Sequence, residues 1–395
     1  MQSIEAAPRR STARERRWSL AAAIASVTVF GLSIGQGGPL LPLLLEERGI
    51  SVALNGLNAG AAFIGVIVGP LLAPLCVRRI GIRNFLLLCF AVDIVLTLAL
   101  KAFDSIGAWF VLRVLLGLVG SSVFTAGEAW INLLAGNRGR GRIIGIYASA
   151  LSAGFGVGPL VLTLTGIEGW SPFVVNAAIT AAATVPLLGA GKDASGFGRD
   201  RGASPLTMFV RAPLIVGVVA GFGVFEAALM ALLPIWGVRI GLGVTLAAAC
   251  LSAVYFGSIV LQMLIGWLSD WVSRIAALRM CCVVGLLGAL VLASIAPSPW
   301  LLLCVLFTWG GAATGIYPVA LSMAGDRFRG TELVTVNAAM VIAYGSGALI
   351  GPALGGMAME LHNPQGLLWL FVLLFVCLLA ATWLTTGQPR RRGSG

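Results

Sequence analysis

The segment Leu367–Ala381 reads LLWLFVLLFVCLLAA without a charged residue, and Leu86–Leu100 reads LLLCFAVDIVLTLAL with one. A helix needs about 20 predominantly apolar residues to cross the hydrocarbon core of a bilayer, which is about 30 Å thick. A membrane β-barrel would instead alternate apolar and polar residues along strands of about ten. These continuously apolar runs therefore predict transmembrane helices, whose backbone hydrogen bonds are all made within one segment.

The composition excludes other protein classes. Of the 395 residues, 58% are hydrophobic and 10% are charged, whereas soluble domains have about 25% charged residues. A disordered chain would lack this apolar content. The net charge of +11 invites a nucleic-acid-binding interpretation, but the basic residues occur in small groups between apolar runs. We interpret them as the basic cytoplasmic loops of a membrane protein and expect no nucleic-acid partner.

Pro, Gly and charged residues separate twelve apolar segments, which predict an all-α membrane protein. The predicted helices are 17–45, 55–76, 84–100, 107–135, 142–166, 172–190, 212–238, 245–272, 277–296, 299–325, 333–359 and 366–386. With the N-terminus inside, 22 of the 26 Lys and Arg residues lie on the cytoplasmic side and three lie outside. Cytoplasmic loops carry such an excess. We therefore expect a multi-pass protein of the inner membrane with both termini in the cytoplasm.

The chain divides into two similar halves. Gly154-x-x-x-Gly158-Pro159 parallels Gly347-x-x-x-Gly351-Pro352, and AGNRGRG at 135–141 parallels AGDRFRG at 324–330. Small residues four apart let two helices approach closely. Because the matches occur in the same order, we expect two pseudo-symmetric six-helix bundles, as in secondary transporters. The predicted parts are a cytoplasmic N-terminal tail (1–17), a first bundle (18–190), a cytoplasmic linker (191–211), a second bundle (212–386) and a cytoplasmic C-terminal tail (387–395).

Four ionisable residues fall within predicted helices, where a charge is costly and marks a functional candidate. They are Asp93, Arg113, Glu128 and Glu226. Arg113 and Glu128 are fifteen residues apart, which is about 22 Å along one helix and about 60° around it. Both side chains can therefore face the interior of the bundle, in opposite leaflets.

Each of these residues has a functional and a structural interpretation. Arg113 serves either a substrate or coupling site or a structural hydrogen-bond hub. Glu226 is a proton-coupling candidate, the alternative being a pair with Arg113 or with helix carbonyls. Asp93 is a site candidate or makes an interhelical hydrogen bond, and Glu128 fits a cytoplasmic gate. Further candidates for orienting a solute, or for packing alone, are Gln36, Asn132, Tyr255, Gln262, Tyr317, Asn337 and Tyr344, with Trp130 and Trp309 as stacking surfaces or membrane anchors.

The sequence contains no Gly-x-x-x-x-Gly-Lys-Ser/Thr loop, so ATP is not the expected energy source. It has a single histidine, His362, and its seven cysteines lack metal-ligand spacing. No Ser/His/Asp or Cys/His set can be assembled at one depth. We therefore expect neither an enzyme nor a cofactor or metal site.

The order of these motifs resembles that of the major facilitator superfamily, and within it the YcaD-like branch. The stretch GWLSDWVSR at 266–274 is similar to the superfamily's cytoplasmic Gly-x-Leu-x-Asp signature, and Arg113-x-x-x-Gly117 to its helix-4 arginine motif. Residues 128–132 (EAWIN), followed by NRGR at 137–140 and Tyr147, resemble the branch. So do Tyr317-Pro318, Asn337, Tyr344, Gly351 and Pro352. The likeness extends over residues 18–386.

The first-half loop PLCVRRIGIR at 74–83 departs from the superfamily pattern, because Pro and Arg stand where Gly and Asp are usual. The resemblance implies an acidic cytoplasmic latch in the second half, at Asp270 with Gly266 and Arg274. In the first half, one option is that Glu128 pairs with Arg78, Arg79 or Arg83.

The resemblance implies a secondary transporter that moves a small organic solute by alternating access. We expect it to be coupled to protons, with Arg113 and Glu226 as the principal residues, and to act as a monomer in the lipid bilayer. Its direction is open, since efflux and uptake of a vitamin-like nutrient use the same residues. The alternative is a membrane receptor, lipid-handling protein or assembly factor that uses this fold without solute coupling.

Overall fold

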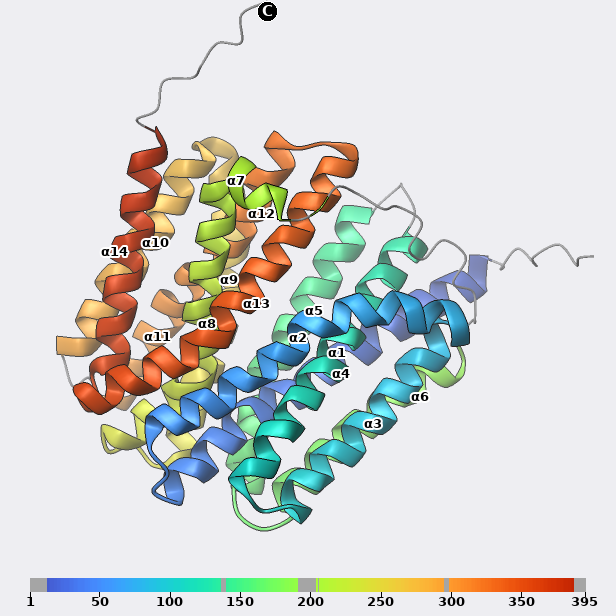
Figure 1. The fold of residues 1–395 in the computed structure, drawn as a ribbon, viewed down its shortest axis with the longest axis horizontal. Coiled ribbons are helices and arrows are strands. Elements are labelled where there is room, and N and C mark those ends of the chain that lie inside the picture. The colour runs from blue at the N-terminus through green and yellow to red at the C-terminus, as the bar shows by residue number, and fades with distance from the viewer. Residues whose placement is uncertain (1–12, 136–139, 191–203, 205, 295–297, 387–395) are drawn as a thin grey trace, which may run out of the picture.

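The computed structural model of the chain describes residues 13–135, 140–190, 204, 206–294 and 298–386, and the described part is a bundle of helices (Figure 1). Residues 1–12, the C-terminal tail, most of the 191–211 linker and residues 136–139 of the first loop motif lie outside it. Residues 13–17, predicted as part of the N-terminal tail, belong to α1. The helices are α1 (Ala13–Glu47), α2 (Val52–Ile80), α3 (Ile82–Ala102), α4 (Ile106–Ala135), α5 (Arg140–Thr165), α6 (Ser171–Leu188), α7 (Thr207–Arg211), α8 (Pro213–Arg239), α9 (Val244–Trp271), α10 (Arg274–Ser294), α11 (Pro299–Ala313), α12 (Ile316–Arg327), α13 (Gly330–Leu361) and α14 (Gly366–Thr386).

Twelve segments of the described chain are long and apolar enough to cross a membrane, which confirms the predicted number of spans. The predicted helix 299–325 is interrupted, because α11 ends at Ala313 and α12 begins at Ile316. Pro318 has no N–H to donate, and its ring clashes with the carbonyl four residues earlier, that of Thr314. The helix tightens there, with Gly315 N–H donating to the Ala312 carbonyl at 3.1 Å. The short α7, at the end of the predicted linker, lacks an apolar run that would have marked it.

The buried apolar side chains form two clusters. One is built from residues between Ala22 and Ala190, on α1–α6, and the other mainly from residues between Met208 and Leu378. We call α1–α6 the first half and α7–α14 the second half. In Figure 1 the two halves converge at the end that carries the α1–α2 loop and diverge toward the start of α1 and the end of α14. Each half therefore packs around its own core.

The repeated glycine motifs mark the closest helix contacts within each half. Gly158 lies against α1, where an added Cβ would be 2.5 Å from the Gln36 nitrogen. Gly351 lies against α8, where an added Cβ would be 2.8 Å from the Val224 Cα. Because α5 packs on α1 in the first half as α13 packs on α8 in the second, the same contact occurs twice. This repetition is the structural basis of the predicted two-bundle symmetry.

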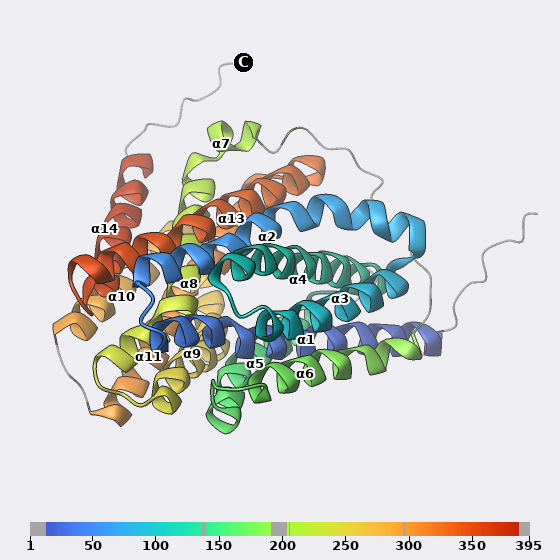
Figure 2. The same ribbon diagram turned by 60° about the horizontal axis from the view of Figure 1, so that its bottom comes forward.

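The halves meet mainly along two helix pairs, with a smaller contact between α1 and α8. Helix α2 packs along α13, and Figure 2 shows these two helices side by side. Gly356 of α13 lies so close to α2 that an added Cβ would be 2.8 Å from the Val52 carbonyl carbon. Helix α5 packs along α9 of the other half. Relative movement of the halves must therefore pass through these two contacts.

We expect Gly351→Ala to lower the stability of the folded protein by about 1–3 kcal/mol, because the new methyl group meets the α8 backbone. Thermal unfolding of the purified full-length chain in detergent measures this change. Gly217→Ala is the matched control, since Gly217 is also on a helix and has open space around its Cα. Equal melting temperatures for the two variants would contradict the packing role of Gly351.

Candidate functional site

A cavity of about 490 Å³ lies between the halves. It is lined by residues of α1–α6 from the first half and of α8, α9, α12 and α13 from the second. Its volume falls within the ~300–1,000 Å³ of pockets that enclose small organic ligands. The polar side chains on its wall are Ser33, Asp93, Thr97, Arg113, Ser121, Thr125, Glu128, Asn176, Glu226, Tyr255, Tyr317 and Tyr344.

The structure brings the four predicted ionisable residues to this one cavity. Arg113 and Glu128 both lie on α4, which is continuous from Ile106 to Ala135. Their separation of about 22 Å along the helix therefore spans a large part of the cavity. Glu128 lies nearer the end where the halves diverge and is exposed. The cavity therefore extends toward that side.

Glu226 lies near the middle of α8, on the wall contributed by the second half. Tyr344, from α13, lies close to its carboxyl group and lines the same cavity. Tyr344 also makes an edge contact with Phe63 of α2, with ring centroids 6.3 Å apart. Tyr344 therefore lies between Glu226, on the second half, and Phe63, on the first half.

A second aromatic contact crosses the cavity wall. Phe155 of α5 stacks on Tyr255 of α9, with centroids 5.6 Å apart and planes inclined by 23°. Phe222 and Tyr317, from α8 and α12, pack with centroids 5.6 Å apart. Phe63 and Phe155 from the first half, and Tyr255, Tyr317 and Tyr344 from the second, therefore give the cavity aromatic surfaces on both sides.

Asp93 takes part in a chain of hydrogen bonds that joins α1, α3 and α6. Thr180 donates to an Asp93 carboxylate oxygen at 3.1 Å, and the Ser33 and Thr180 hydroxyls are 2.8 Å apart. Ser33 lies 2.8 Å from the Asn176 amide oxygen, and Asn176 donates to the Gln36 side-chain oxygen at 3.1 Å. This is the interhelical hydrogen bonding that the sequence left open as one interpretation of Asp93.

Several predicted solute-orienting residues do not line this cavity. Gln36 is buried and donates to the Pro172 carbonyl at 2.9 Å. Trp130 is buried because it lies about 200° around α4 from Glu128. Trp309 is buried among Phe225 and Phe371 and donates to the Gly285 carbonyl at 2.7 Å, so it stacks within the protein core. Gln262 and Asn337 also lie outside the cavity wall, and the side chain of Asn132 lies outside the described part of the chain.

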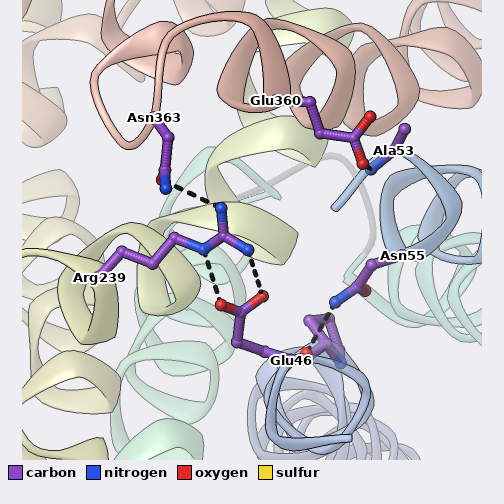
Figure 3. A network of polar contacts seen from close by, with 7 residues as sticks. Glu46, Ala53, Asn55, Arg239, Glu360 and Asn363 are labelled. Atoms are coloured by element: carbon purple, nitrogen blue, oxygen red, sulfur yellow. Dashed lines mark hydrogen bonds and ion pairs between the residues drawn. The ribbon is translucent and has the colours of Figure 1, made fainter. Parts of the chain in front are cut away.

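Polar contacts hold the two halves together at the end where they converge (Figure 3). Arg239 of α8 donates from Nε and Nη2 to the two carboxylate oxygens of Glu46, at the end of α1, over 2.6 and 3.1 Å. Its Nη1 donates to the Asn363 side chain at 3.0 Å. The Ala53 N–H, in the first turn of α2, donates to Glu360 of α13 at 3.0 Å. We call these residues the interhalf gate.

The Ala53 contact follows from the chemistry of helix ends. The first four N–H groups of a helix have no partner within it, and a carboxylate near that end is favoured by the helix dipole. Glu360 comes from the other half of the molecule, so it satisfies a helix end only while the halves are together. Asn55 supports the same region from within the first half by donating to the Pro42 carbonyl at 2.8 Å. At this end the halves are therefore joined by one ion pair, between Arg239 and Glu46, and by the hydrogen bond of a helix end to Glu360.

At the opposite end, the predicted latch residues lie in several places. Arg83 donates to the carbonyls of Leu188 and Ala190 at the end of α6, at 2.8 and 3.2 Å. Glu128 accepts a hydrogen bond from Tyr147 at 3.1 Å. Arg78 and Arg79 are exposed in the last turn of α2. The side chain guanidinium of Arg83 is thus directed at α6.

In the second half, Arg274 makes an ion pair with Asp326 of α12, with Nε and Oδ2 3.1 Å apart. Gly266 is exposed near the end of α9, and the side chain of Asp270 lies outside the described residues. The Arg274 pair joins α10 to α12 and so strengthens the second half internally.

Sequence reasoning missed the gate residues and the partners of Asp93. Glu46 and Arg239 directly follow the predicted helices 17–45 and 212–238, where the sequence indicates only charges of the outer loops. The available signal was that these opposite charges end the first membrane-spanning helix of each half, α1 and α8. Ser33, Asn176 and Thr180 carried no signal of their own, because hydroxyl and amide side chains are common in membrane helices.

The family model described as Major Facilitator Superfamily matches residues 19–317. The chain belongs to the major facilitator superfamily. It is 27% identical to the uncharacterized MFS-type transporter YfkF of Bacillus subtilis, over 92% of this chain and 94% of that protein. It is 24% identical to the uncharacterized MFS-type transporter YcaD of Escherichia coli, over 85% and 88% of the two chains.

Among solved structures, the nucleoside transporter NupG superposes with a TM-score of 0.78 at 13% identity. The match covers 95% of this chain and 100% of NupG, which shows a shared fold. The chain is therefore a major facilitator superfamily transporter with the fold predicted from its sequence, a multi-pass membrane protein and not an enzyme.

Removing the charges of the interhalf gate should let the two halves separate at the end where they converge. We expect Glu46→Gln with Arg239→Gln to favour the open state by roughly tenfold to a hundredfold, since hydrogen bonds to charged groups contribute about 1.5–3 kcal/mol. Spin-label distances between Leu54→Cys and Leu361→Cys, in a background without the native cysteines, measure the opening.

Two variants control this experiment. Exchanging the charges, with Glu46→Arg and Arg239→Glu, should restore the short distance. Arg48→Gln should leave the distance unchanged, because Arg48 pairs with Asp104 within the first half at the same end. A double variant with the wild-type distance distribution would show that the gate does not hold the halves together.

Proposed function

We propose that the chain is a secondary transporter of the inner membrane that moves a small organic solute by alternating access, coupled to protons. The observation that supports it most is the cavity built by both halves, with the interhalf gate at one end and a water-exposed Glu128 at the other. Secondary transporters hold the solute at such a place and rock two bundles around it. Because one chain builds the whole cavity, we propose that the monomer is the functional unit.

We propose that both termini are cytoplasmic. The distribution of Lys and Arg supports this orientation, since 22 of 26 would lie inside. The interhalf gate would then face the outside, and the cavity would open to the cytoplasm. In this inward-facing state, a solute bound between Arg113 and Glu226 is released inward and blocked outward. Breaking the gate and closing the opposite end exposes the same residues to the outside.

Glu226 is the proposed proton site. A carboxyl group can lose its charge by binding a proton, which lets it move between two aqueous phases as a neutral group. Glu226 lies on the second half and touches Tyr344, whose ring contacts Phe63 of the first half. Its protonation therefore acts at a contact that rearranges when the halves move. Asp93 is the less favoured proton site, because its hydrogen bonds serve to join α1, α3 and α6.

Glu226→Gln should abolish proton-driven accumulation of solute while leaving exchange of solute across the membrane intact, because Gln keeps the size of Glu but binds no proton. The full-length protein is reconstituted in liposomes and incubated with a pooled library of small metabolites. Mass spectrometry identifies the metabolites that enter liposomes with the protein but not liposomes without it, and one of these is labelled for the assays. Accumulation is measured with and without a pH gradient, and exchange is measured by counterflow of the labelled solute.

Glu168→Gln is the matched control, since Glu168 is an exposed carboxyl in the α5–α6 loop. Accumulation by Glu226→Gln at the wild-type level would overturn the coupling role. Binding of a solute without counterflow would instead favour a receptor that uses this fold.

A further inference from the structure

Arg113 differs from the other ionisable residues of the cavity in its hydrogen bonding. Its Nε and Nη2 atoms are buried and have no hydrogen-bond partner among the described residues. Two carboxyl groups of the cavity accept a hydrogen bond from a hydroxyl, Glu128 from Tyr147 and Asp93 from Thr180. The third, Glu226, lies close to Tyr344. Buried polar groups are nearly always paired, so an exception needs an explanation.

The unpaired atoms form one edge of the guanidinium. Nε–H and Nη2–H point in parallel, which suits the two oxygens of a carboxylate or another oxyanion. The interhalf gate shows this recognition within the same molecule, because Arg239 uses its Nε and Nη2 to hold both oxygens of Glu46. Arg113 is itself one of the residues that line the cavity, and this edge of its guanidinium is buried beside the cavity.

The cavity's own carboxyl groups do not meet this edge. Among the ion pairs of the described residues, none joins Arg113 to Asp93, Glu128 or Glu226. Glu128 is about 22 Å away along α4. The pair between Glu226 and Arg113 that the sequence left open is therefore not formed in this conformation.

Proton binding by the carboxyl groups makes the net charge of the cavity more positive, while the positive charge of Arg113 stays. Asp and Glu lose their charge by binding a proton, whereas a guanidinium stays protonated in proteins. Of the cavity-lining residues that the structure describes, Arg113 is the one cation. When the carboxyl groups carry protons, the cavity is positive, and its donor edge and its charge both favour an anion.

The rest of the wall defines the body of the solute. Phe63, Phe155, Tyr255, Tyr317 and Tyr344 present aromatic rings to the cavity. Such walls bind apolar and flat groups, while a few polar groups fix the orientation. From the unpaired Arg113 edge in an aromatic cavity, we infer that the solute is a small organic anion with one carboxylate or similar oxyanion on an apolar body. This inference rests on the proposed transport function for its biological meaning.

Binding to the purified full-length protein tests the inference without requiring transport. The probes are phenylacetate, 3-phenylpropionate and indole-3-acetate, each with its neutral amide and its cationic amine, together with phenyl phosphate as a second oxyanion. Dissociation constants are measured by calorimetry in detergent. We expect at least one carboxylate or the phosphate to bind about tenfold or more tightly than its amide and its amine, as expected for a charged hydrogen bond.

Variants locate the anion. Arg113→Gln should remove this preference, and Arg113→Lys should keep only part of it, since it keeps the charge without the two-donor edge. Lys101→Gln is the matched control, because it removes a positive charge at the end of the neighbouring helix α3. The preference of the wild-type protein needs no variant and is measurable even if Arg113→Gln fails to fold.

Tighter binding of the amines or amides, or no binding of any anion at millimolar concentration, would overturn the inference. So would an anion preference that survives in Arg113→Gln. Counterflow in liposomes separates the two proposals. If an anion binds through Arg113 but shows no counterflow, only the proposed transport function is contradicted. If a cationic solute shows counterflow, only the inference of an anionic solute is contradicted.

Discussion

Close contact between helix backbones at glycine is the constraint on which the rest of this structure depends. Gly158 sets α5 against α1, and Gly351 sets α13 against α8. In a membrane, where lipid is as apolar as the side chains, such close packing replaces much of the hydrophobic driving force. It makes two compact bundles that meet mainly along α2–α13 and α5–α9. The cavity exists because these bundles touch at one end and diverge at the other.

The spans were predictable because apolar length and charged loops report directly on the membrane. Their ends were less predictable, since α1 and α13 extend several residues beyond the apolar core. The break before α12 was predictable from Pro318, because proline cannot make the helical backbone hydrogen bond. A hydropathy pattern does not contain this information. The two-bundle arrangement was visible in the repeated Gly-x-x-x-Gly-Pro motifs, because a close contact at the same place in both halves needs the same small residues.

The ionisable residues of the candidate site were predictable, because burying a charged side chain in a membrane helix is costly. Asp93, Arg113, Glu128 and Glu226 stood out because a charge is rare in an apolar helix, and all four line the cavity. Neutral residues gave no such signal. Trp309 turned out to fill the core of the second half, since an aromatic ring satisfies packing as well as binding. The pairing of Glu46 with Arg239 depends on two chain segments meeting in space, which one sequence does not disclose.

The gate residues lie at helix ends beside water, with Arg239 and Glu46 about one fifth exposed at their side chains. Separating them does not leave bare charges in a dry interior, because hydration replaces each bond as it breaks. The cost of parting is thus the difference between a partly hydrated ion pair and two hydrated charges, which permits repeated cycling. Dissolved ions compete for the same charges, so the balance between the two shapes responds to ionic strength.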